Sequence, residues 1–396
     1  MGFAVYLLAL ATFATGTAEN IVIGILPDVA AGLGVPVALA GQLTAVFSIT
    51  FALTAPLALM LTRHMRRKHM LAAALVLFIA SNFLAAASQH FWVLFAARVG
   101  MAAASATACL VATMLATEAV SPDMRGRAIG VIFMGVSGSL VLGVPVGMVI
   151  CDLFGWRSVF VALALLAGFV LAVCHFVVPS ADARSPAESG YARHLSALPL
   201  VCAQLVSILM IGGHFVLFAY LAPYIAGVVG VEGRGLVLAF VAFGVAGVSG
   251  GYLGGLLSDR LGPRAALLLT PLAYLAALLA IPAVAGAGIL FFAVMMAWAC
   301  ISWMISPVVQ NFLMATDPQT AAAGVSLNLS AMHVGVGLGT AAGGALLGPL
   351  PLQALPWAGS MLAALAVVSA AMAFRGTGKG SAESVDAMRD APVELQ

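Results

Sequence analysis

The sequence predicts an all-α integral membrane protein with twelve transmembrane helices, arranged as two pseudo-symmetric halves of six helices each. Three observations predict this fold. Of the 396 residues, 63% are hydrophobic and only 8% are charged, whereas soluble domains carry about 25% charged residues. Apolar stretches long enough to cross a bilayer recur along the whole chain, and one polar segment divides them six and six. This composition excludes a soluble protein and a disordered one, and a net charge of +2 gives no basic field for nucleic acid.

Each apolar stretch is expected to form a helix, because a helix crosses the ~30 Å hydrocarbon core in about 20 residues. Unpaired backbone groups are too costly in lipid for an open strand, and unbroken apolar runs such as 160–174 lack the alternation of a β-barrel. The expected spans are 3–26, 38–62, 70–88, 91–117, 127–151, 157–178, 196–226, 235–257, 265–285, 288–314, 320–347 and 354–374.

The N-terminal stretch and the central polar segment predict how the chain is divided into parts. The first span resembles a secretion signal, but no basic residue precedes Arg63 and the apolar stretch continues past Glu19, so we expect a transmembrane helix. The polar segment PSADARSPAESGYARHL reads as a linker. The expected parts are an N-terminal half 1–178, a cytoplasmic linker 179–195, a C-terminal half 196–374 and a disordered cytoplasmic tail 375–396.

The positions of the basic residues predict the orientation. If the N-terminus is cytoplasmic, thirteen of the sixteen Lys and Arg residues fall in inside loops or the tail. Cytoplasmic loops of membrane proteins carry such an excess of positive charge. Both termini are therefore expected in the cytoplasm, with the protein in the cytoplasmic (inner) membrane of a bacterium.

The two halves carry related loops at matching places. GLLSDRLGPR at 255–264 follows the second span of the C-terminal half, and ALMLTRHMRR at 58–67 follows the second span of the N-terminal half. The first of these resembles the signature loop of the major facilitator superfamily, in which two such halves form one transporter. The resemblance implies that Asp259, Arg260 and Arg264 form a conformational lock; anchoring of the topology by positive charge is the alternative.

Further motifs resemble the drug:proton antiporter branch of that superfamily. These are Gly-Val-Pro-Val-Gly at 143–147 with Trp-Arg at 156–157, and an arginine, Arg98, in the fourth span. Pro-x-x-Arg-Gly-Arg-Ala-x-Gly at 122–130 resembles bacterial sugar, chloramphenicol and purine efflux pumps. The resemblance implies export driven by the proton gradient, with no cofactor.

Glu19 and Arg98 are the ionisable residues expected well inside the membrane. A charge at that depth is costly, so its default interpretation is functional. Glu19 lies about 8 residues, or ~12 Å, from the outer end of its span, and Arg98 about 7 residues, or ~10 Å, from the outer end of its own. We expect Glu19 to bind the proton in competition with substrate, and Arg98 to set the proton affinity of that carboxylate. The alternative is a structural ion pair between spans one and four.

Polar and aromatic side chains within the spans are candidates for a substrate cavity. Amides beside an aromatic plane suit a flat heterocycle, and lone histidines titrate near neutral pH; packing between helices is the alternative for all of them. His333 in span eleven is a further titratable candidate. The predicted cavity residues are Asn20, His214, Trp303, Gln310 and Asn311.

Small residues and a proline in spans five and eleven predict where helices slide and bend. Glycines let backbones approach closely, and a proline removes one backbone hydrogen bond. We expect spans five and eleven to build a rocking interface between the halves, with static packing as the alternative. The residues are Gly143, Pro145, Gly147 and Gly343.

Together these features predict a proton-coupled antiporter that exports small organic molecules, purine-like metabolites or drugs, by alternating access. The alternative is a proton-independent facilitator, or a symporter that imports a small metabolite. The chain contains no phosphate-binding loop, no H-E-x-x-H and no G-x-S-x-G motif, so neither ATP-driven transport nor an enzyme is expected. The five cysteines contain no C-x-x-C pair, so we expect no metal site. The expected partners are a small-molecule substrate, protons and the lipid bilayer, with the chain as a monomer.

Overall fold

The computed structural model describes residues 2–61, 66–121, 124–177 and 191–389, without side chains beyond residue 374 and at a few other positions. Every regular element within these ranges is a helix. Twelve of the helical segments are long and apolar enough to cross a membrane, as expected. The structure therefore confirms the all-α, twelve-span fold.

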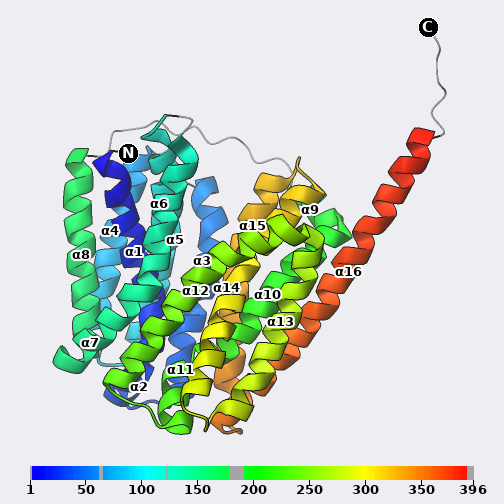
Figure 1. Cartoon of the computed structure of the whole chain (residues 1–396). Helices are drawn as coiled ribbons and strands as arrows, with labels where there is room; N and C mark the ends of the chain where they lie inside the picture. Colours follow the sequence, from blue (N-terminus) through cyan, green and yellow to red (C-terminus); the bar gives the residue numbers. More distant parts are fainter. Residues whose placement is uncertain (1, 62–65, 122–123, 178–190, 390–396) are drawn as a thin grey trace.

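The helices form two groups that lie side by side, α1 to α8 and α9 to α16 (Figure 1). The first group consists of α1 (Phe3–Gly24), α2 (Leu26–Leu33), α3 (Val37–Leu61), α4 (Arg67–Ala86), α5 (Phe91–Glu118), α6 (Arg125–Gly138), the π-helical segment η2 (Ser139–Gly143), α7 (Val144–Phe154) and α8 (Trp156–Val177). The second consists of α9 (Tyr191–Ser196), α10 (Leu198–Phe218), α11 (Leu221–Tyr224), the π-helical segment η3 (Ile225–Val229), α12 (Arg234–Leu261), α13 (Pro263–Val284), α14 (Ile289–Thr316), α15 (Ala321–Leu346), the 3-10 segment η4 (Leu352–Ala354) and α16 (Leu355–Arg389).

The two ends of the bundle differ in which elements they carry. Helix α1 begins and α16 ends at one end, which we call the terminal end; α2, α7 and α11 lie at the other, which we call the opposite end (Figure 1). Most of the predicted linker 179–195 lies outside the described residues, but its last part belongs to α9. The backbone of α16 continues to Arg389, into the expected tail. Because the side chains from residue 375 and all residues from 390 are not described, disorder of the tail stays a prediction.

Prolines alter three of the expected spans, and two of these are interrupted. Span one breaks at Ile25, because Pro27 has no N–H to continue the helix and begins α2 instead. Span seven breaks at Tyr220, shortly before Pro223. In span five, Pro145 is accommodated by the wider turns of η2, so the span continues without a break.

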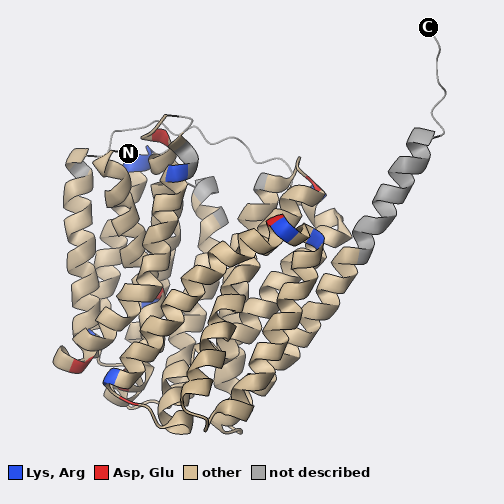
Figure 2. Cartoon of the chain, in the orientation of Figure 1, with Lys and Arg blue, Asp and Glu red and all other residues tan. Residues whose placement is uncertain are grey.

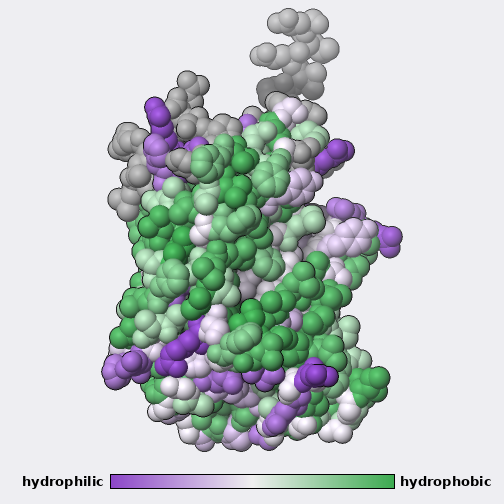
Figure 3. Space-filling view, turned by 90° about the vertical axis from the view of Figure 1, so that its left-hand side faces the viewer, coloured by the Kyte–Doolittle hydropathy of each residue, from purple (hydrophilic) through white to green (hydrophobic). Residues whose placement is uncertain are grey.

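The surface and the charge distribution agree with a membrane protein. Charged residues gather at the two ends of the bundle, and few lie along the length between them (Figure 2). On the face formed by the first group, apolar side chains cover the middle and polar ones lie at the ends (Figure 3). Exposed leucine and phenylalanine side chains such as Leu165 and Phe169 fit a lipid-facing surface.

The two halves meet along two seams. In one, α15 packs on α3, where a Cβ built on Gly337 would lie 2.5 Å from Ile49. In the other, α12 packs on η2 and α7, where a Cβ built on Gly244 would lie 2.8 Å from the carbonyl oxygen of Leu140. Spans five and eleven therefore belong to separate seams, span five with span eight and span eleven with span two. Both spans lie at contacts between the halves, and rocking on these contacts stays a prediction.

The seams close at the opposite end and separate toward the terminal end. Gly251 lies two turns beyond Gly244 on the same face of α12, and a Cβ built on it would meet no atom within 4 Å. At the opposite end, Gly41 of α3 lies directly against the ring of Tyr220, and α2 packs on α11. The halves thus form a bundle that is closed at the opposite end.

Candidate functional site

The Glu19 carboxylate faces a histidine of the other half. Its Oε1 lies 3.5 Å from Nε2 of His333, which joins α1 to α15 across the α3–α15 seam. The side chains are 19% and 12% exposed, so the pair is largely but not fully withdrawn from solvent. Partial access matters here, because a proton must be able to reach a group that carries it.

The surroundings of His333 decide which of its ring nitrogens titrates. Nδ1 lies 2.9 Å from the carbonyl oxygen of Leu329, which can only accept a hydrogen bond, so Nδ1 carries a hydrogen. The ring stacks on Phe51 with 4.0 Å between centroids and 2° between planes, which fixes its orientation. Nε2 is therefore the nitrogen whose protonation changes, and it is the one that faces Glu19. One proton between Nε2 and Oε1 leaves the pair with no net charge.

Arg98 holds three helices together through backbone carbonyls. Its guanidinium donates to the main-chain oxygens of Ala18, of Glu19 at 3.2 Å and of Leu43 at 3.1 Å, and lies 4.3 Å from the centroid of the Phe47 ring. The side chain is fully buried. Arg98 and Glu19 are thus at the same depth, as predicted, but they meet through the Glu19 backbone. Among the described residues the carboxylate pairs with His333 and not with Arg98, which does not fit the alternative of a structural ion pair between spans one and four. That Arg98 sets the proton affinity of Glu19 stays a prediction.

The predicted cavity residues are spread over several environments. Asn20 donates from Nδ2 to the Gly16 carbonyl of its own helix at 3.1 Å. Trp303 packs on α12, where a Cβ on Gly247 would lie 2.8 Å from its ring. Gln310 donates to Ser306 at 3.1 Å, and Asn311 is half-buried on the same helix.

His214 lies inside a cluster of aromatic rings. The ring centroids of Phe218, Phe243 and Trp298 lie 4.9, 5.8 and 4.7 Å from its own. The side chain is fully buried, and neither ring nitrogen has a hydrogen-bond partner among the described residues. The structure therefore places His214 in a core cluster of the second half, and does not bring it to Glu19.

The residues of the predicted lock lie at the terminal end, where α12 meets α13. Asp259, Arg260 and Arg264 are all exposed. The ion pairs described at this end lie within single halves: Arg67 of α4 with Glu118 of α5, and Arg193 of α9 with Asp317 after α14. The lock formed by these three residues stays a prediction.

The predicted sliding residues lie at close helix contacts. Gly143 and Gly147 of span five lie directly against Thr17 and Ile21 of α1, within one half. A Cβ on Gly343 would lie 2.6 Å from the Val216 carbonyl oxygen of α10. Pro145 begins α7 after the π-helical turns. These contacts are close packing, and sliding of the helices on them stays a prediction.

The described residues contain no group of three His, Cys, Asp or Glu side chains that could hold a metal ion. Fold and site together define a multi-pass helical membrane protein, built of two six-span halves that face each other across a titratable pair. The sequence model of the Major Facilitator Superfamily matches residues 8–326. The chain belongs to this family of membrane transporters.

Relatives and a solved structure agree with this assignment. A probable sugar efflux transporter of Mannheimia succiniciproducens is 24% identical over 367 residues, which is 92% of each chain. A chloramphenicol resistance protein of Streptomyces lividans is 34% identical over 265 residues, covering 66% of this chain and 68% of that protein. The crystal structure of a D-xylose-proton symporter superposes with a TM-score of 0.77 over 94% of this chain and 97% of that one, at 14% identity, and so shares the fold.

Proposed function

We propose that this transporter is a proton-coupled antiporter that exports small organic molecules by alternating access, with Glu19 and His333 as its proton site. The observation that carries the proposal is the contact between Glu19 and His333 across the α3–α15 seam. A titratable pair that is made or broken when the halves move links protonation to conformation. The exporting direction is supported by the sugar efflux and chloramphenicol resistance relatives.

The pair supplies the coupling as follows. While the seam is closed, one shared proton leaves Glu19 and His333 neutral as a unit. When the halves separate at the opposite end, the two side chains part, and Glu19 takes a proton from that side. Substrate that enters from the terminal end competes for the same carboxylate and displaces the proton there. With both termini in the cytoplasm of a bacterium, protons move inward and substrate moves outward.

The charges near the site favour neutral or cationic substrates over anions. Arg98 is the permanent positive charge at this depth. Its guanidinium already donates hydrogen bonds to three carbonyl oxygens of the protein, so it is not offered to an anionic substrate. The remaining charged group is the Glu19 carboxylate, which attracts cations and accepts hydrogen bonds. Purine-like metabolites and drugs belong to this class of neutral or cationic molecules. The proton gradient supplies the energy, and the proposal requires no cofactor.

The test is substrate-evoked proton flux in proteoliposomes that contain a pH dye. The panel contains nucleobases, nucleosides, sugars, amphenicols and cationic dyes, applied to wild type, Glu19→Gln and the control Asp152→Asn. Asp152 is an exposed carboxylate at the opposite end. We expect a proton signal in wild type and in the control, and none in Glu19→Gln.

Two outcomes would contradict the proposal. Substrate movement without any proton signal in wild type would make the protein a facilitator. A proton signal in the same direction as substrate would make it a symporter that imports a metabolite. A response confined to one class of the panel would identify the substrate class.

A further inference from the structure

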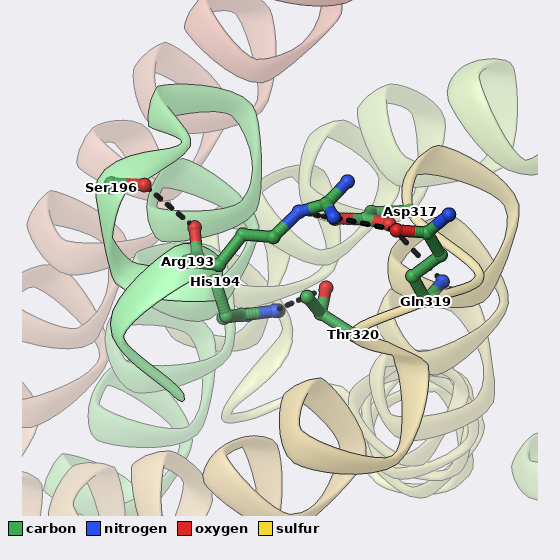
Figure 4. Close-up of polar contacts among 6 residues, drawn as sticks. All are labelled: Arg193, His194, Ser196, Asp317, Gln319 and Thr320. Carbon is green, nitrogen blue, oxygen red and sulfur yellow. Dashed lines mark hydrogen bonds and ion pairs between the residues drawn. The ribbon is translucent and has the colours of Figure 1, made fainter. Parts of the chain in front are cut away.

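Helix α9 is the first described element after the segment that joins the halves, and it is anchored to the second half at the terminal end. Arg193 of α9 pairs with Asp317 at 3.2 Å and donates to Oε1 of Gln319 at 2.6 Å (Figure 4). Tyr191 lies 3.3 Å from the Ser326 hydroxyl of α15. Both contacts are with the region where α14 ends and α15 begins.

The side chain of His194, also on α9, lies between α10 and α15. The side chain is 1% exposed, and its Nδ1 lies 3.4 Å from the Thr320 hydroxyl (Figure 4). On the other side, Nε2 lies 3.1 Å from Nε2 of Gln204 on α10. A Cβ built on Gly324 would lie 2.5 Å from the ring, so the ring fills its space completely.

The hydrogen bonds around Gln204 determine the protonation state of His194. Gln204 Nε2 donates to the Gly324 carbonyl oxygen at 2.9 Å, which fixes the orientation of the amide because a carbonyl only accepts. Asn328 donates to Gln204 Oε1 at 3.0 Å, which requires the same orientation. The second N–H of Gln204 therefore points at His194 Nε2, which must accept it. Docked His194 is neutral, with its hydrogen on Nδ1 toward Thr320.

We propose that α9 is a pH-sensitive latch, which is docked on the second half while His194 is neutral and released when His194 takes a proton. A protonated ring would point an Nε2–H at the N–H of Gln204, so two hydrogen-bond donors would face each other where a hydrogen bond is now made. From α10 and α15 the ring is faced by Gln204, Thr320 and Gly324, none of which carries a charge. The charged groups nearby are Asp317, which favours protonation, and Arg193, which is already paired with it.

The direction of the pH effect follows from the burial. Burial lowers the pKa of His194, and the attraction of Asp317 offsets this only in part. Released His194 has the ordinary pKa of about 6.5, so docking is at full strength above that value and weakens as pH falls through it. Between pH 7.5 and pH 5.5 the docking equilibrium is expected to fall by up to about tenfold, the full amount applying if the docked ring stays neutral at pH 5.5. Acidification at the terminal end would thus free one end of the segment that joins the halves.

Hydrogen exchange of the full chain in lipid nanodiscs tests the latch. The readout is the protection factor of the amides of residues 191–197, each corrected for the intrinsic exchange rate, at pH 7.5 and pH 5.5. Wild type is expected to lose protection by up to about tenfold. His194→Gln cannot be protonated and is expected to show no pH-dependent loss, while His90→Gln, which replaces an exposed histidine, is expected to behave as wild type.

A second variant keeps the test decisive if His194→Gln does not dock at either pH. Gln204→Glu replaces the amide donor with a carboxylate that accepts from a protonated ring, so the loss between pH 7.5 and pH 5.5 should disappear. The proposal is overturned if wild type keeps its protection at pH 5.5. It is equally overturned if the same loss persists in Gln204→Glu, because another group would then be titrating.

Discussion

One methyl group at Gly244 should push apart the seam between α12 and η2. A Cβ at this position would lie 2.8 Å from the carbonyl oxygen of Leu140 and 2.9 Å from Cα of Val141, where ordinary contacts are 3.4–4 Å. Both neighbours are backbone atoms, so no side chain can rotate away. The strain is relieved only if the halves separate at the opposite end.

The size of the effect can be bounded from this geometry. Extra methyl groups in close-packed interiors cost about 1–3 kcal/mol. If that cost applies only to the form closed at the opposite end, Gly244→Ala shifts the ratio of open to closed forms by about 5–150-fold. The matched control is Gly251→Ala, which adds the same methyl group to the same face of α12 where a Cβ meets no atom within 4 Å.

Distances between spin labels at the opposite end measure this ratio. Phe154, at the end of α7, and Ile289, at the start of α14, are 73% and 88% exposed and belong to different halves. In a background without native cysteines, Gly244→Ala should move the distance distribution toward longer values, and Gly251→Ala should leave it unchanged. An unchanged distribution in Gly244→Ala, or an equal shift in both variants, would refute the assignment of this seam.

Three further predictions concern stability, and thermal unfolding in detergent checks each. Arg98→Lys should lower the free energy of unfolding by about 2–4 kcal/mol, because one ammonium cannot bond all three carbonyl oxygens; an unchanged Tm would contradict the role of Arg98 in holding three helices together. His214→Phe should keep or raise stability, by up to about 1–3 kcal/mol, since it removes two buried nitrogens that lack partners. A fall in Tm would show that those nitrogens are needed. Glu118→Gln should cost less than about 1 kcal/mol, because the pair with Arg67 is partly exposed.

The course of the spans was predictable because composition and length alone define a membrane helix. The positions at which the spans are interrupted could not be predicted in the same way. Pro27 and Pro223 lie at breaks, and Pro145 is absorbed by π-helical turns, whereas Pro271 and Pro282 lie inside α13 without ending it. What a proline does to a span depends on whether neighbouring helices leave room for a break, and that packing is not visible in one sequence.

The site shows a similar limit. Counting residues along spans one and four placed Glu19 beside Arg98, and the two do meet. The same counting gave no reason to pair Glu19 with His333: Glu19 lies 16 residues into α1 and His333 12 residues into α15, about 24 and 18 Å. The pairing depends on the tilt of the spans and on α15 packing against α3, which are properties of the assembled halves.

The most direct test of the proton site compares two transport modes in proteoliposomes, once a substrate is known. Exchange of labelled for unlabelled substrate needs no net proton movement, whereas accumulation driven by a pH gradient does. His333→Gln should retain exchange and lose accumulation, Glu19→Gln should lose accumulation, and Asp152→Asn should retain both. Accumulation that persists in Glu19→Gln would show that the proton binds elsewhere, and would contradict the account.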